Sequence, residues 1–321
     1  MRVYLNSVLL AVALSISTYP TAANAHQTVP QPPPENVPPE ATRSGGAKSE
    51  NRPLWQFGFG AGGGVTPHYP AANQSSLRFL AIPTFRYRGR ILRSDDDGTR
   101  ARLIRLEDTE IDLSGGASFP VNSYENEARK GMPKLDWIGE AGPRVGFRWR
   151  LRRDDCVADG PCGRGDTLRL LFPIRTVFSS DFASLSHRGF ILQPEISFER
   201  VFKKSELIDA QIAFEIDTSV SIISDHLANY FFSVQPEYAT TERPTYDAKP
   251  GLLSISSGLV LKVSQRRGSN VGSTFFVGLR HNHHGLSANQ TSPLHKADQT
   301  VTLFTGVNVY WLSSERSDSD E

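Results

Sequence analysis

GEAGPRVGFRWRLR, residues Gly139–Arg152, alternates between two kinds of side chain from Ala141 onward. One set is apolar and ends in aromatic and aliphatic residues: Ala141, Pro143, Val145, Phe147, Trp149 and Leu151. The other set contains four arginines: Gly142, Arg144, Gly146, Arg148, Arg150 and Arg152. A period of two residues predicts a β-strand. Arginines opposite aromatic residues indicate a barrel wall with lipid on one side and a polar lumen on the other.

The same alternation recurs along most of the chain, with almost no helical periodicity. Strands are expected at 54–62, 78–88, 100–107, 110–119, 141–152, 167–175, 189–201, 207–217, 230–234, 251–264, 273–281 and 299–312. This pattern predicts an all-β protein, an antiparallel transmembrane β-barrel of about twelve strands, with ten strands as the alternative. A soluble β-sandwich or jelly roll would alternate in the same way. Aromatic residues at the strand ends of the apolar face, typical of interfacial girdles, favour the barrel.

An even number of strands places both termini at the periplasmic end of such a barrel. The connections at 65–77, 152–166, 235–249 and 283–298 would then face outward. The 120–136 connection would be periplasmic, and it is long for that side.

The segments that flank the strands have distinct compositions. Residues 1–25 combine a basic start, an apolar core and Ala23-Asn24-Ala25, which predicts a signal peptide cleaved between Ala25 and His26. Residues 26–53 are rich in Pro, Glu, Ser and Gly and predict a disordered periplasmic lead-in. The barrel is expected over 54–312, followed by an acidic tail at 313–321.

Composition excludes several classes of protein. The net charge of the full sequence is +1, which gives no support for nucleic-acid binding. After the signal peptide, no stretch of about 18 uncharged apolar residues occurs, so a membrane-spanning helix is not expected. The two cysteines, Cys156 and Cys162, flank a Gly-Pro turn in a chain expected to be exported, and this spacing predicts a small disulfide.

Charges on the polar face sort by sign along the chain. The strands at 141–152 and 167–175 are basic, and those at 189–201 and 207–217 are acidic. We therefore expect a charge ladder in the lumen, formed by Arg144, Arg148, Arg150, Arg169, Arg175, Glu195, Glu199, Asp209 and Glu215. Such a ladder would act as a charge-paired plug of a small barrel. A selectivity constriction or a ligand site is the alternative.

Motifs for catalysis or for cofactor binding are absent from the sequence. There is no Gly-x-Ser-x-Gly, no phosphate-binding loop and no dinucleotide fingerprint. Ser186-His187 gives a weak hint of hydrolase chemistry, and His281-Asn282-His283-His284 resembles a metal-binding tract without a carboxylate partner. The sequence therefore predicts no catalytic residue, no cofactor and no metal site.

A resemblance to the MipA/OmpV family (MltA-interacting outer-membrane protein) rests on several short motifs over about 54–312. Asn229–Ala239 is followed by Arg243, Tyr246 and Gly251, where Gly251 opens a strand. A Gly-rich aromatic first strand leads to Pro67-x-Tyr69, then to Leu77-Arg78 and Pro83, and Ser292-Pro293 precedes the last strand. Ser233 stands where the family usually has Gly, and the acidic tail follows where family members end on an aromatic residue.

The resemblance implies a protein of the Gram-negative outer membrane, in contact with its lipid and monomeric. The founding member is regarded as a scaffold that links a lytic murein transglycosylase to a bifunctional murein synthase. We expect a non-enzymatic scaffold for murein hydrolase and synthase enzymes, with a narrow channel for small solutes as the alternative and an outer-membrane lipid enzyme as a distant third. No binding residues transfer from the family.

Overall fold

The computed structural model describes residues 54–88, 92–95, 98–101, 104–105, 109–151, 165–202, 209–267 and 271–314. Within these ranges the chain is almost entirely β-strand, with one short α-helix, Asp225–Phe232 (α1). The strands are Trp55–Pro67 (β1), Ser75–Arg88 (β2), Leu92–Asp95 (β3), Gly98–Ala101 (β4), Ile104–Arg105 (β5), Thr109–Ser118 (β6), Trp137–Arg150 (β7), Thr167–Ser180 (β8), Leu185–Leu192 (β9), Glu195–Val201 (β10), Ala210–Ile223 (β11), Gly251–Arg267 (β12), Val271–His283 (β13) and Gln299–Ser313 (β14). The all-β fold expected from the alternation is confirmed.

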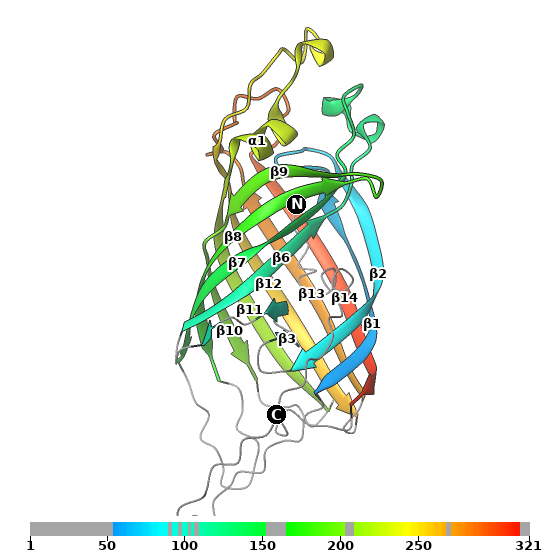
Figure 1. Cartoon of the computed structure of the whole chain (residues 1–321), viewed down its shortest axis with the longest axis vertical. Coiled ribbons are helices and arrows are strands. Elements are labelled where there is room, and N and C mark those ends of the chain that lie inside the picture. Colours follow the sequence, from blue (N-terminus) through cyan, green and yellow to red (C-terminus); the bar gives the residue numbers. More distant parts are fainter. Residues whose placement is uncertain are drawn as a thin grey trace, which may run out of the picture.

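The strands form one antiparallel sheet that curls into a barrel (Figure 1). The first long strand, β1, pairs with the last, β14, so the first and last described strands are neighbours in the sheet. Strands β9 and β10 lie end to end along β8 and together make one crossing, interrupted at Gln193-Pro194. Among the described residues, nine long strands and this shared path give ten crossings, which is the ten-strand alternative.

Apolar side chains face outward from the barrel and polar ones face inward. Leu77, for example, is 78% exposed, and the exposed set also includes Phe57, Phe59, Phe79, Trp149, Phe172, Ile174, Ile196, Ile216, Leu259, Phe275, Leu279, Leu303 and Trp311. Buried on the inner face are Gln56, Thr84, Asp112, Ser114, Glu140, Arg175, Ser197, Asp217, Ser219, Ser254, Ser256, Arg280, Thr300 and Thr302. Soluble domains distribute residues the other way round, whereas a barrel in lipid requires this arrangement.

Residues Gly139–Arg150 of the opening stretch lie in β7 as expected, Arg152 lies outside the described residues, and the register of β7 contains one break. Ala141 pairs with Thr176 and Arg144 with Pro173, and the ladder is interrupted between these pairs. Pro143 and Pro173 have no amide hydrogen to donate there. A Cβ on Gly142 would lie 2.0 Å from the carbonyl oxygen of Ile174, so glycine permits this close approach of the two strands.

The strand expected at 230–234 is wrong, because this segment belongs to α1 and the loop after it. Leu227, Ala228, Phe231 and Phe232 are buried, a spacing of one and four residues that is helical. The expected hairpin of 100–107 with 110–119 is found in part, because β5 pairs antiparallel with β6, but it does not make two long crossings among the described residues. Of the described residues there, only Thr109–Ser118 (β6) runs the length of a long strand.

Both errors affect the predicted sides of the loops. The 120–136 connection lies at the same end as the loops after β1, α1 and β13, since Asn126 Nδ2 contacts His68 Nδ1 and Arg243 Nη1 donates to the carbonyl of Ala128. The ends of the 152–166 connection lie at the opposite end, which is also where β1 begins and β14 ends, and Leu151 N donates there to Asp166 O. The sides expected for these two connections were therefore wrong.

Several expected features lie outside the described residues. These are the Ala25–His26 cleavage site, the 26–53 lead-in, Cys156 and Cys162, and the tail from 315 onward. In the part of the chain that the structure describes, no helix has the length and apolarity needed to cross a membrane.

Candidate functional site

Ion pairs between neighbouring strands cross the inner face of the barrel. Arg144 donates from Nε and Nη2 to both oxygens of Asp112 on β6, at 2.8 and 2.7 Å. Arg175 contacts Glu140 on β7 at 3.4 Å and also donates to Gln193 Oε1 at 3.1 Å. Two arginines of the expected ladder thus meet acidic residues that the sequence did not assign to it.

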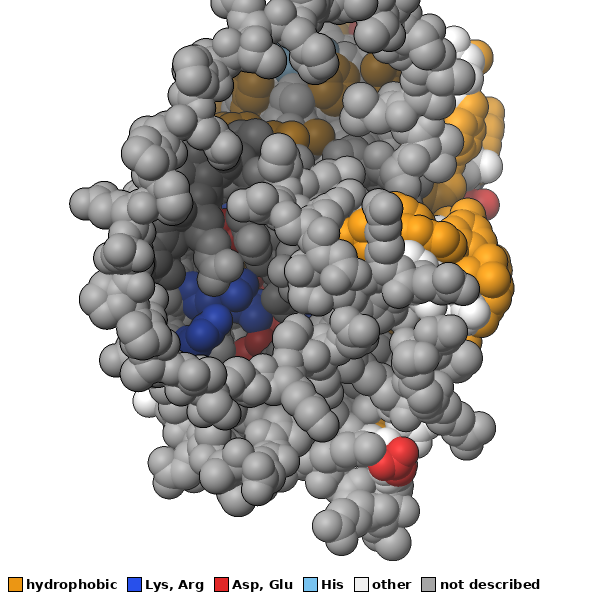
Figure 2. Space-filling model, turned by 60° about the horizontal axis from the view of Figure 1, so that its bottom comes forward, with side chains coloured by type: hydrophobic (Ala, Val, Ile, Leu, Met, Phe, Trp, Pro, Cys, Tyr) orange, Lys and Arg blue, Asp and Glu red, His pale blue; other side chains and the backbone are white. Residues whose placement is uncertain are grey.

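Acidic residues of the expected set meet cations toward the end of the barrel opposite α1. Arg169 contacts Glu199 at 2.5 Å and Glu215 at 3.8 Å, and Lys262 of β12 contacts Glu215 at 2.8 Å. Figure 2 shows charged side chains of both signs inside the hollow at this end of the barrel. The pairs compensate one another and narrow the lumen.

The remaining residues of the expected ladder occupy more peripheral positions. Arg148 is 3.9 Å from Glu110, and Glu195 is half-buried opposite Ser219 on the inner face. Arg150 is exposed at the end of β7, and Asp209 lies in an exposed turn with a φ of 47°.

The most deeply buried pair of the lumen joins Asp217 to Arg280, which the sequence analysis did not pair. Their oxygen and nitrogen atoms lie 2.6 Å apart, and the side chains are 3% and 5% exposed. Asp217 on β11 and Arg280 on β13 both stand opposite Gly258 on the intervening β12. A Cβ on Gly258 would lie 2.4 Å from Asp217 Oδ1 and 2.8 Å from Arg280 Nη2, so glycine lets the two charges meet across β12. The sequence carried no signal for this pair, because only the strand register places Gly258 between the two charges.

A cap built from four loops and α1 lies over the end of the barrel opposite the start of β1 and the end of β14 (Figure 1). Its centre is apolar, and its largest fully buried side chains are Tyr69, Phe232, Leu294, Val121 and Val234. Hydrogen bonds tie the loops together: Tyr69 Oη donates to Leu294 O at 2.7 Å, and Ser292 Oγ donates to Phe232 O at 2.7 Å. Burial raises the pKa of Tyr69 to about 12, which keeps this hydroxyl a donor.

Two arginines join the cap loops through backbone carbonyls. Arg129 is 3% exposed and donates to Phe231 O at 3.0 Å, with its guanidinium 5.8 Å from the centre of the Tyr69 ring. Arg243 donates to Tyr238 O, Ala128 O and Lys130 O. Each arginine therefore satisfies carbonyls of two loops that lie far apart in the sequence.

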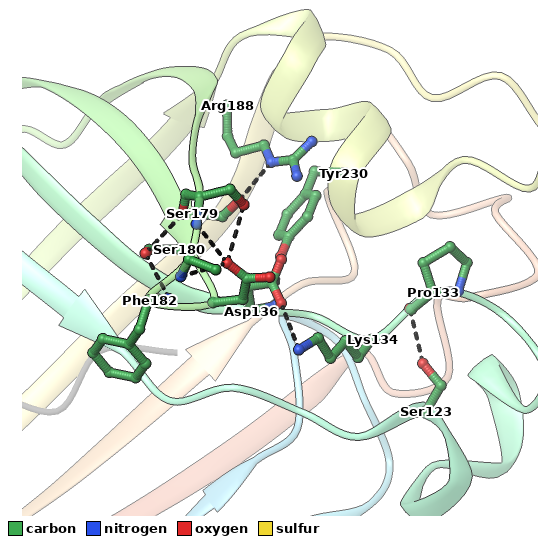
Figure 3. A network of polar contacts seen from close by, with 12 residues as sticks. Ser123, Pro133, Lys134, Asp136, Ser179, Ser180, Phe182, Arg188 and Tyr230 are labelled. Carbon is green, nitrogen blue, oxygen red and sulfur yellow. Dashed lines mark hydrogen bonds and ion pairs between the residues drawn. The ribbon is translucent and has the colours of Figure 1, made fainter.

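The cap is fastened to the barrel rim by the polar network of Figure 3. The Tyr230 hydroxyl accepts from Asp136 N at 2.8 Å, and the guanidinium of Arg188 lies 4.4 Å from the centre of the Tyr230 ring. Arg188 Nε donates to Ser179 Oγ at 2.8 Å. These contacts connect α1 to β8, to β9 and to the loop before β7.

Beneath the cap, the outer half of the lumen contains a cavity with about 690 Å³ of empty space, part of it open to solvent. Its lining runs from Tyr69 and Phe231 in the cap to Glu140, Thr302 and Arg280 on the strands. This cavity and the cap above it form the candidate functional site.

His284 lies in the lining of this cavity, directly after β13. Its Nδ1 is 3.2 Å from Leu253 O and its Nε2 is 3.2 Å from Thr300 Oγ1, an arrangement suited to a neutral ring that donates from Nδ1. The ring is 3% exposed, and burial lowers the pKa of His284 to about 4. His284 is therefore neutral at pH 7.

The low pKa of His284 makes stability depend on pH in acid. Because the unfolded chain binds this proton near pH 6.5 and the folded chain only near pH 4, the contribution is complete above about pH 6.5. It is lost as the pH falls toward 4, by an amount on the order of 3 kcal/mol. We expect the urea midpoint of refolded protein to fall between pH 7.5 and pH 4.5, and to fall less in H284N. Equal pH dependence in both proteins would contradict this assignment.

The two hints of chemistry in the sequence do not assemble into sites. His281 is half-buried and contacts Gln299 at 3.4 Å, whereas His284 points into the cavity. Within the described ranges, no three His, Cys, Asp or Glu side chains group closely enough to hold a metal. His187 stands on the outer face between the rings of Phe178 and Phe190.

An apolar exterior, a lumen of paired charges and a loop cap at one end define a β-barrel of the membrane type with a capped lumen. The family model for the MltA-interacting protein MipA matches residues 59–310. The chain belongs to this family, as the short motifs of the sequence indicated. No curated protein matches the chain.

Proposed function

We propose that this protein is an outer-membrane β-barrel that acts as a non-enzymatic scaffold for murein-remodelling enzymes. The observation that carries the proposal is the capped, charge-paired lumen in a member of a family named for interaction with MltA, a murein enzyme. A barrel whose lumen is filled by ion pairs and closed over by an apolar cap is suited to anchoring and not to steady conduction.

The orientation of the barrel supports contact from the periplasm. The described chain begins and ends at the end opposite the cap, where Trp55 N donates to Ser314 Oγ, and short periplasmic turns with longer external loops are the rule for such barrels. The cap then faces outward, and the enzymes bind at the opposite end of the barrel. The exposed apolar side chains contact outer-membrane lipid, and the barrel is monomeric.

Affinity purification of the tagged full chain from cross-linked envelopes tests the scaffold. We expect a murein hydrolase or synthase to be recovered with it and identified by mass spectrometry, and a purified lytic transglycosylase to bind the isolated barrel directly. Deletion of 26–53 should weaken recovery if the lead-in makes the contact, whereas R243A, at the outer end, should leave recovery unchanged.

Two results would count against the scaffold. One is the absence of any murein enzyme from wild-type complexes together with no direct binding. The other is a steady single-channel conductance in planar bilayers that R148A or E195A alters, which would favour a solute channel.

A further inference from the structure

The cavity under the cap has one apolar wall. Ile138 of β7, Val177 of β8 and Ile191 of β9 line it from the barrel, and Leu227 and Phe231 line it from α1. All five side chains are buried. This wall is an apolar surface at the level where the cap meets the strands.

The opposite wall is made of small hydroxyl residues on neighbouring strands. It comprises Ser221 of β11, Ser254 and Ser256 of β12, and Thr300 and Thr302 of β14, with Asn282 of β13 among them. Ser256 Oγ donates to Asn282 Oδ1 at 2.8 Å, and Asn282 Nδ2 donates to Thr300 Oγ1 at 3.3 Å. Because each hydroxyl can both donate and accept a hydrogen bond, the wall matches a ligand whose groups also donate and accept hydrogen bonds.

These small side chains are also what keeps the space open. Farther from the cap, an inward position of the same β12 strand carries Lys262, which fills the lumen by pairing with Glu215. Ser254 and Ser256 occupy the corresponding inward positions beside the cavity. The polar lumen is therefore blocked by charges at one level and left hollow at the next.

The charges that border the cavity are already compensated. Glu140 is paired with Arg175, and Arg280 with Asp217. His284 is neutral at pH 7, because burial lowers its pKa to about 4. A charged ligand would meet no uncompensated counter-charge among these residues, so the cavity favours a neutral one.

We propose that this cavity is a binding site for a neutral saccharide of one or two rings. A sugar ring carries hydroxyls along its edge and C–H groups on its faces, which correspond to the hydroxyl wall and to the wall of Phe231, Leu227 and Val177. The site does not depend on a contact with murein enzymes.

Titration calorimetry on the full chain, in a detergent without a sugar headgroup, tests the proposal with glucose, maltose and the β-1,4 dimer of N-acetylglucosamine. We expect at least one sugar to bind with a dissociation constant of about 1 mM or tighter. S256L places a bulky apolar side chain in the hydroxyl wall and should weaken binding tenfold or more. S264L is the matched control, because Ser264 is an inward position of β12 away from the cavity lining and contacts Thr274. It should bind as wild type does.

T302V keeps the side-chain volume and removes one hydroxyl, so it tests the same site even if S256L fails to fold. It should weaken sugar binding by roughly 2- to 10-fold, the value of one hydrogen bond. Failure of all three sugars to bind wild type would overturn the proposal, as would wild-type affinity in both S256L and T302V. Binding of the free alkyl chain of an added amphiphile instead of sugar would also overturn it.

Discussion

Replacement of Arg280 by methionine is expected to destabilise the barrel by about 3–5 kcal/mol, because it leaves the carboxylate of Asp217 buried without its cation. The two side chains are 5% and 3% exposed and touch at 2.6 Å across Gly258. Burial in the lumen keeps solvent from replacing the lost partner. The free energy of unfolding is measured by urea titration of refolded protein in micelles, with heat-dependent gel mobility as the readout.

The double variant D217L/R280M separates the cost of an orphaned charge from the worth of the pair. Removing both charges should recover most of the loss, since an apolar pair often replaces a buried ion pair at little cost. G258A tests the geometry alone, because its Cβ would fall between the two groups and push them apart. G139A is its control, as a Cβ there has nothing within 4 Å. The assignment fails if R280M and the double variant are equally unstable, or if G258A and G139A behave alike.

The sequence predicted the barrel class because the side chains of each strand alternate between two environments, lipid and lumen. In Gly139–Arg152 the alternation survives even the break at Gly142-Pro143, since the parity of Arg144, Arg148 and Trp149 is unaffected. An inside-out distribution needs only period two and the sorting of aromatic from charged residues. Both are visible in a single chain.

Strand count was less accessible, because it depends on tertiary context. A period of two is supported here by only three residues, Tyr230, Phe232 and Val234. The same residues also fit a helix that packs on the barrel rim. The weak hairpin near 100–119 added a second crossing that the barrel does not have. Two extra crossings leave the direction of the later strands unchanged, so the loops at 235–249 and 283–298 were expected at the same end as the loop after β1, where the structure has them.

Side-chain partners in the lumen could be predicted by face but not by pairing. The sign of charge along the chain indicated that 141–175 would meet 189–217, and Arg169 does meet Glu199. Arg144 and Arg175 instead find Asp112 and Glu140 on adjacent strands. Adjacent strands are closest, and only the register, which the sequence did not contain, determines which residues stand opposite.

Replacement of Arg129 by methionine should open the cap without unfolding the barrel. The variant removes the donor of Phe231 O at 3.0 Å and leaves this carbonyl in an apolar interior, whereas Pro133 O loses Arg129 at 3.4 Å but keeps Ser123 Oγ at 2.8 Å. The expected cost is about 2–4 kcal/mol, from one orphaned acceptor and the lost contact with the Tyr69 ring. Because the cap is a separate cluster at one end of the barrel, this cost appears as local opening. Amide exchange in 119–136 and 224–250 should therefore accelerate about 30-fold or more, as each tenfold corresponds to about 1.4 kcal/mol.

K134M provides the matched control from the same loop. Lys134 is 63% exposed and stands 3.5 Å from Asp136, so its loss should cost no more than about 1 kcal/mol and barely change exchange. The strands β12, β13 and β14 should keep their protection in both variants, since their hydrogen bonds do not involve the cap. Equal exchange in R129M and K134M would show that the cap does not depend on this arginine. Loss of protection in the strands of R129M would show that cap and barrel unfold as one unit, and the cap would then be part of the barrel's stability and not a separate closure of its lumen.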